Sequence, residues 1–173
     1  DRFGLHCHLE LYSEKEIREI LKRSSRILKI DITEEAAITL SSRCRGTPRI
    51  ANRVLRRCRD VAQVRGNGVI DKIAAEKTLE MLGIDSEGLD PMDRKILSVV
   101  IDKFNGGPVG INTLSAALNE EQNTIEEVYE PYLIQKGLLS RTPRGRVATQ
   151  IAYQKMQKTI PSSKMLEQEQ FDF

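Results

Sequence analysis

The chain has 173 residues, of which 39% are hydrophobic and 30% are charged, and its formal net charge is only +2. These proportions are typical of a globular protein with one moderate core or two small ones. No run approaches the ~20 apolar residues of a membrane span, and no signal peptide is visible, so we expect a cytoplasmic protein without membrane contact. The net charge is too small to argue for nucleic-acid binding by itself. The first residue is Asp1 rather than Met, which suggests a piece of a longer protein.

The cysteines give no sign of a disulfide framework. Cys7, Cys44 and Cys58 are odd in number and form no C-x-x-C pair. Because His6 and His8 flank Cys7, a small metal cluster is conceivable, but alternate residues of a short strand explain the same spacing equally well. We therefore predict no metal site, and reduced cysteines in a cytosolic protein.

The first half of the chain carries the signals of four short helices. Three helix starts are marked by good N-cap residues: Ser13, with Glu16 completing a capping box, Thr33 and Asp71. Gly46 follows the second helix and Gly83 ends the fourth. A short extended segment over residues 1–12 precedes them. The pattern predicts a small helical bundle over residues 1–84, followed by a linker that reaches residue 90.

The third helix of this bundle is rich in arginine. Gly46 breaks the preceding segment, Thr47 can cap the new helix, and Pro48 suits its first position. One side of the helix carries an apolar stripe, which is formed by Ala51, Val54, Leu55, Cys58, Val61 and Ala62. The other side carries Arg49, Arg53, Arg56 and Arg57.

Arg49 differs from the other three arginines in its position. A surface helix with solvated arginines would explain the pattern without any ligand. However, Arg49 lies in the first turn, beside exposed amides and the positive end of the helix, where a cation disfavours helix stability. The same position suits an arginine that helps to bind an anion.

The second half of the chain has a different rhythm. It predicts a helix from Pro91 to Phe104, a very short strand at Val109 and Ile111, a helix capped by Asn112, and a helix opened by Asn123 or Thr124. Pro131 should kink or split the last of these helices, in which we expect Val128 to face inward. Short strands over residues 138–141 and 146–148 flank a turn, and a final helix reaches about residue 158. This order is typical of a winged-helix domain, predicted over residues 85–158, with a flexible tail over residues 159–173.

Charge is strongly segregated within this second half. Residues 119–130 contain acids and no base: Glu120, Glu121, Glu126, Glu127 and Glu130. Residues 131–166 contain bases and no acid: Lys136, Arg141, Arg144, Arg146, Lys155, Lys158 and Lys164. An acidic helix would repel phosphate, so we predict that the hairpin binds DNA instead, through its three arginines. A solvated hairpin tip is the alternative.

Seven segments, in order, resemble the RuvB family of AAA+ ATPases. They are DRFG (1–4), LELY (9–12), GTPRIANRVLRR (46–57), DPMDRKIL (90–97), FNGGPVG (104–110), EPYLIQKGLL (130–139) and RTPRGRVAT (141–149). Each match is weak alone, but their common order and compatible spacing make the set specific. The resemblance implies a mainly α fold: an AAA+ helical lid followed by a winged-helix domain with a small β-hairpin wing.

The resemblance also implies roles for three residues. Arg49 is similar to the sensor-2 arginine, which reaches the γ-phosphate of its own subunit's ATP. Arg2 is similar to the arginine finger, which acts in trans on the ATP of a neighbouring subunit, and Tyr12 to a residue at the adenine end of the pocket. No G-x-x-x-x-G-K-[ST] motif occurs in the sequence. ATP with Mg²⁺ would therefore be bound mainly by an upstream domain, and we expect the chain alone to be inactive.

For a complete protein, the resemblance implies an ATP-dependent DNA helicase that drives branch migration of Holliday junctions in recombination and repair. Such a protein would form a hexameric ring around duplex DNA and work with RuvA. Two alternatives stay open on the sequence alone. One is a non-enzymatic winged-helix DNA-binding regulator, and the other is a clamp-loader-like or initiator AAA+ protein.

Overall fold

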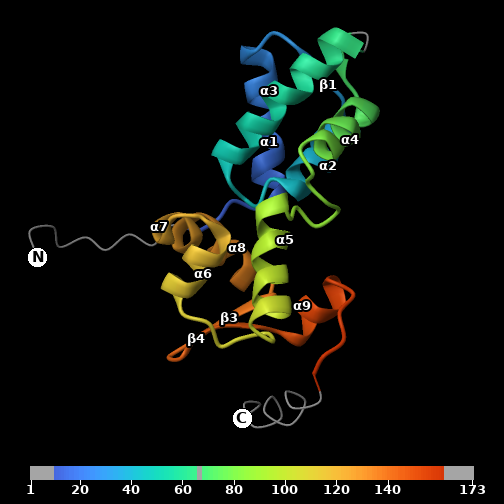
Figure 1. Cartoon of the computed structure of the whole chain (residues 1–173). Helices are drawn as coiled ribbons and strands as arrows, with labels where there is room; N and C mark the ends of the chain where they lie inside the picture. The colour runs from blue at the N-terminus through green and yellow to red at the C-terminus, as the bar shows by residue number, and fades with distance from the viewer. Residues whose placement is uncertain (1–9, 66–67, 162–173) are drawn as a thin grey trace, which may run out of the picture. The chain divides into compact units, whose positions relative to one another are not determined.

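The computed structural model describes residues 10–65 and 68–161, and the chain divides into two compact units after Asp90 (Figure 1). Both units are mainly helical, and an antiparallel hairpin lies in the second, which confirms the predicted fold class. Within the described residues, no helix is long and apolar enough to cross a membrane. The predicted tail lies outside the described residues from position 162 onward.

The first unit is a helical bundle, and its helices are α1 (Glu14–Ile27), α2 (Glu34–Arg43), α3 (Pro48–Arg65) and α4 (Lys72–Met81). The predicted caps are confirmed: Ser13 and Glu16 form a reciprocal capping box, Thr33 accepts from the amide of Ala36, and Asp71 accepts from the amide of Ala74. Each cap satisfies a backbone amide that the helix itself leaves unpaired. Helix α3 begins at Pro48, as its sequence predicts.

A pair of very short parallel strands, which the sequence did not predict, joins the segment after α1 to the segment after α3. β1 (Asp31–Ile32) follows α1 and β2 (Val69–Ile70) follows α3, with Asp31 opposite Val69. Strands of two residues are too short to show any alternation of polar and apolar residues. They form because the chain ends of two packed helices meet, which local sequence does not reveal.

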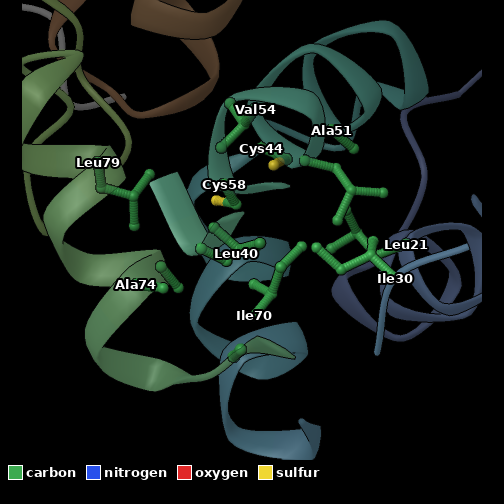
Figure 2. Packing of buried hydrophobic residues seen from close by; sticks show 14 of the residues in the cluster. Leu21, Ile30, Leu40, Cys44, Ala51, Val54, Cys58, Ile70, Ala74 and Leu79 are labelled. Atoms are coloured by element: carbon green, nitrogen blue, oxygen red, sulfur yellow. The ribbon is translucent and has the colours of Figure 1, made fainter. Parts of the chain in front are cut away.

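The core of the first unit lies between its helices (Figure 2). The stripe predicted on α3 is buried, with Ala51, Val54, Leu55, Cys58 and Ala62 inaccessible to solvent, and only Val61 is partly exposed. Side chains from the other helices, among them Leu21, Leu40 and Leu79, complete the cluster. The four arginines predicted on the other side of α3 are exposed, as the pattern predicts: Arg49, Arg53, Arg56 and Arg57.

The second unit is assembled from shorter elements. They are α5 (Pro91–Ser98), the π-helical η1 (Val99–Lys103), α6 (Ile111–Leu118), α7 (Gln122–Thr124), the π-helical η2 (Ile125–Tyr129), α8 (Glu130–Gln135), β3 (Leu139–Thr142), β4 (Gly145–Ala148) and α9 (Gln150–Lys155). β3 and β4 are antiparallel and enclose Pro143 and Arg144 in the turn. Pro131 is the second residue of α8, which follows the π-helical segment without a break, so the helix changes type beside the proline but is not split.

Three local predictions in this unit were wrong. Val109 forms a single bridge to Arg146, and Ile111 already begins α6, so Gly110 rather than Asn112 precedes the helix. The following helix begins at Gln122, one residue before the earliest predicted start. Val128 is exposed, because η2 has the wider turn of a π-helix and its side chains do not follow the period of 3.6 residues.

The buried thiols of the first unit yield a first prediction. Burial raises the pKa of Cys44 to about 12 and that of Cys58 to about 11. Since the thiolate is the reactive form, neither residue should react with an aromatic disulfide reagent at pH 8 until the protein is denatured. The measurement should use a Cys7→Ser variant, so that the remaining signal comes from these two thiols. Rapid labelling of the native variant would contradict the packing.

Candidate functional site

The first candidate site is the corner where α3 begins. Gly46 has a φ of +61°, and a Cβ on it would lie 2.6 Å from the carbonyl oxygen of Tyr12. The amide of Tyr12 donates to the carbonyl oxygen of Gly46 over 3.0 Å. Only glycine allows this approach of the two backbones. The turn therefore holds the backbone of Tyr12 against Gly46, which lies three residues before Arg49.

The side chains at this corner are available to a ligand. Arg49 lies in the first turn of α3, is exposed, and Tyr12 is also exposed. No acidic residue occurs in the first turn of α3, so no carboxylate of that turn offsets its positive end. An arginine beside the N-terminus of an 18-residue helix fits a phosphate group by charge and by donor geometry. Of the three residues predicted to serve ATP, Arg49 and Tyr12 are both exposed, and the backbone of Tyr12 contacts Gly46, three residues before Arg49.

The third of these residues, Arg2, lies outside the described part of the chain, as do His6, Cys7 and His8. No group of three or more metal-ligating side chains occurs among residues 10–65 and 68–161.

Arg45, which the sequence analysis passed over, fixes the predicted linker to the first unit. Its side chain is only 7% exposed, its Nη2 lies 3.1 Å from Oδ2 of Asp90, and its Nε donates to the carbonyl oxygen of Gly88 over 2.9 Å. Arg43 donates to the carbonyl oxygen of Asp85 over 3.1 Å. The linker is therefore an ordered turn, and Asp90 directly precedes the first residue of α5.

That turn also has internal support. Oδ1 of Asp85 accepts from the amides of Glu87 and Leu89, each over 2.9 Å, and Leu89 is fully buried. The composition of the segment predicted a linker, because Asp, Ser and Gly favour turns. The same residue types build a compact turn, since Asp85 pairs with the backbone two and four residues ahead.

The second candidate site is the hairpin of β3 and β4, in which the three predicted DNA-binding arginines have different surroundings. Arg146 is 8% exposed, and it donates through Nε and Nη2 to the carboxylate of Glu130, which is 2% exposed. Its Nη2 also donates to Oε1 of Glu126 over 2.6 Å. The hydrogen bonds to Glu130, and to a smaller extent that to Glu126, raise the pKa of Arg146 above its ordinary value. The geometry gives Arg146 a role inside the fold, as the partner of a buried carboxylate.

Arg141 and Arg144 are more accessible than Arg146. The side chain of Arg141 is 53% exposed, and its Nη2 contacts Oε1 of Glu126 over 2.9 Å and Oε2 of Glu130 over 2.8 Å. Arg144 is exposed in the turn after Pro143, and no carboxylate among the described residues pairs with it. Of the three predicted contacts, Arg144 is the most open to phosphate and Arg141 is shared with the acidic helix.

Close backbone packing holds the base of the hairpin. The amide of Val109 donates to the carbonyl oxygen of Arg146 over 3.0 Å, and the amide of Arg146 donates back over 2.8 Å. A Cβ on Gly107 would lie 2.2 Å from the carbonyl oxygen of Arg146, and one on Gly145 would lie 2.4 Å from that of Val109. Glycine at both positions lets the segment before α6 pair with β4, which fixes the backbone that carries Arg146.

The arrangement of helical bundle, ordered linker and hairpin matches known protein families. Residues 12–85 match the family model described as the RuvB AAA lid domain, and residues 86–157 match the RuvB C-terminal winged helix domain. The chain belongs to the RuvB family. It carries the lid and the winged-helix domain, in the order that the sequence resemblance implied.

Individual relatives agree with the RuvB assignment. The Holliday junction branch migration complex subunit RuvB of Koribacter versatilis is 57% identical over 153 residues, which are 88% of this chain and 42% of that protein. The subunit of the same name from Fusobacterium nucleatum is 54% identical over 158 residues, which are 91% of this chain and 48% of that protein. The chain thus spans about half the length of the curated RuvB relatives it matches.

A solved structure supports the same RuvB fold. The Thermotoga maritima RuvB Holliday junction branch migration motor superposes with a TM-score of 0.88 at 47% identity, over 92% of this chain and 54% of that one. Both domains of the present chain therefore have counterparts in the motor structure.

The different surroundings of the wing arginines predict different effects on stability. Arg146→Ala should lower the free energy of unfolding by about 3–5 kcal/mol, because it removes the main partner of a buried carboxylate. Arg144→Ala should change it by less than about 0.5 kcal/mol, since its side chain is exposed. Urea unfolding of the two variants beside the unchanged chain measures both. Equal stability of the three proteins would contradict a structural role for Arg146.

Proposed function

We propose that this chain supplies the lid and the DNA-contacting wing of a RuvB motor that drives branch migration at Holliday junctions. The observation that carries the proposal is that two RuvB domain models match residues 12–85 and 86–157 in the family's order. The exposed Arg144, presented at a turn whose flanking strands are fixed by close backbone contacts, supports a contact with DNA. No observation favours the non-enzymatic regulator or another AAA+ class.

The proposed DNA contact is with the phosphate backbone rather than with bases. Arg144 projects from a turn of two residues between β3 and β4, and the neighbouring Pro143 restricts the turn. A guanidinium there can donate to two phosphate oxygens. Contacts of this kind carry no sequence information, which suits a motor that moves along duplex DNA of any sequence.

For ATP, we propose the roles that the family resemblance implies. Arg49 would reach the γ-phosphate, and its place in the acid-free first turn of α3 supports this. Tyr12 would line the adenine end, which is consistent with its backbone contact to Gly46 in the same corner. ATP with Mg²⁺ would be held mainly by the ATPase core of the complete protein. Arg2 would act in trans, within a hexameric ring that works with RuvA.

The ordered linker gives this proposal a physical connection between lid and wing. Arg45 binds Asp90 and Gly88 with its side chain, and the next residue, Gly46, contacts Tyr12. One short segment thus links the nucleotide-facing corner to the last residue before α5. A displacement of that corner would be passed to the chain entering the winged-helix domain.

Binding to a random-sequence duplex across a salt series tests the wing. Arg144→Ala should weaken binding and flatten the slope of log affinity against log salt by about 0.9, the value for one lost phosphate contact. Arg53→Ala, which removes an exposed arginine from α3, is the matched control and should leave the slope unchanged. If Arg53→Ala alone flattened the slope, DNA would contact the lid, and the proposed wing contact would fail.

ATP hydrolysis by a protein that joins this chain to its ATPase core tests the nucleotide-facing roles. Arg2→Ala and Arg49→Ala should each reduce the DNA-stimulated rate strongly, by about 10³-fold or more for the finger, without changing the unfolding temperature. Arg53→Ala again serves as the control, because it removes the same charge one turn along α3. A normal rate for Arg49→Ala would remove the sensor-2 assignment.

A further inference from the structure

The hairpin of the second unit carries a charge cluster whose members are not equivalent. The cluster consists of Glu126, Glu130, Arg141 and Arg146, which are joined by hydrogen bonds across η2, α8, β3 and β4. The charges of two carboxylates and two guanidinium groups cancel. Two of the three arginines of the hairpin are therefore neutralised within the fold itself.

The two carboxylates differ in burial and in the contacts they make. The side chain of Glu130 is 2% exposed, and its two oxygens accept from Nε and Nη2 of Arg146. The side chain of Glu126 is 34% exposed and lies at the rim of the cluster. Oε1 of Glu126 also accepts from Nη2 of Arg146 over 2.6 Å, so Glu126 is shared between Arg146 and Arg141. The carboxylate of Glu130 would still compensate the charge of Arg146 if Glu126 were neutral.

Arg141 donates to Oε2 of the buried Glu130 over 2.8 Å, and its second acceptor is the partly exposed Glu126. The distance between its Oε1 and Nη2 of Arg141 is 2.9 Å, and the side chain of Arg141 is half exposed. An ion pair at this exposure is weak, and solvent and salt compete with it. A phosphate oxygen would offer Arg141 an acceptor of the same charge and similar geometry.

We propose that Glu126 is an intramolecular competitor of the DNA backbone for Arg141, and so a residue that limits the affinity of the wing for DNA. Binding would exchange a carboxylate for a phosphate at Arg141, while Arg146 stays with Glu130. Arg144 would make the permanent contact, and Arg141 would make an exchangeable one. The inference rests on the proposed DNA contact of the wing and adds an element that keeps this contact weak enough to be released.

Replacement of Glu126 by glutamine tests this inference. Glu126→Gln keeps the shape and one acceptor oxygen but raises the charge of the cluster by one. It should increase affinity for a random-sequence duplex about 3–10-fold at low salt and steepen the salt slope by up to about 0.9. Glu127→Gln is the matched control, because Glu127 is the adjacent acid, is exposed, and has no ion pair among the described residues. It should have a much smaller effect.

A double-mutant cycle assigns the gain to Arg141. Arg141→Ala should cost more affinity in the Glu126→Gln protein than in the unchanged chain. Equal effects of Glu126→Gln and Glu127→Gln, with Arg144→Ala still weakening binding, would overturn the inference and leave the proposed function intact. An Arg144→Ala protein that binds DNA normally would overturn the wing contact itself, and the inference with it.

Nitrogen NMR of the arginine side chains provides a second measurement that needs no substitution at the cluster. During titration of the unchanged chain with duplex DNA, the guanidinium signals of Arg141 should shift while those of Arg146 stay in place. Unchanged signals of Arg141 at saturating DNA, or equal shifts for both residues, would overturn the exchange.

Discussion

The buried pair of Glu130 and Arg146 is the constraint on which the second unit depends. Burial of a carboxylate such as Glu130, which is 2% exposed, is costly unless a cation or hydrogen-bond donors lie against it, and Arg146 supplies both. Glu130 is the first residue of α8, and Arg146 belongs to β4. The pair therefore sets how the acidic helical segment lies against the hairpin, and this in turn decides which arginines reach the solvent. Such a pair costs desolvation energy, so its main contribution is to specify one arrangement.

The first unit has a comparable constraint at Gly46, where two backbones meet too closely for any side chain. On one side lies Tyr12, and on the other lies Arg45, whose side chain holds the linker. Arg45 and Gly46, just before α3 begins, thus contact both Tyr12 and the linker residues that precede α5.

Much of the fold could be predicted because its signals are local. A cap such as Ser13 with Glu16 acts over three residues, and Pro131 marks the first turn of α8, where a proline is tolerated. The stripe of α3 was equally visible, since one helix face repeats every three to four residues. Val128 was misplaced because a π-helical segment changes that repeat, and β1 and β2 were missed because two-residue strands exist only through their partner.

The sequence by itself determined the family, the order of the main helices and the hairpin, and the separation of acids from bases along the second half. It did not determine what that separation is for. Sequence reasoning named all three wing arginines as candidates for DNA, with Arg141 and Arg144 placed at the turn and a contact by Arg146 left open. Only the tertiary structure brought Glu126 and Glu130 against Arg141 and Arg146 and left Arg144 exposed. The physical reason is that the strength of a charge depends on its burial and its partners, and residues 11 to 20 positions apart become partners only when the chain folds.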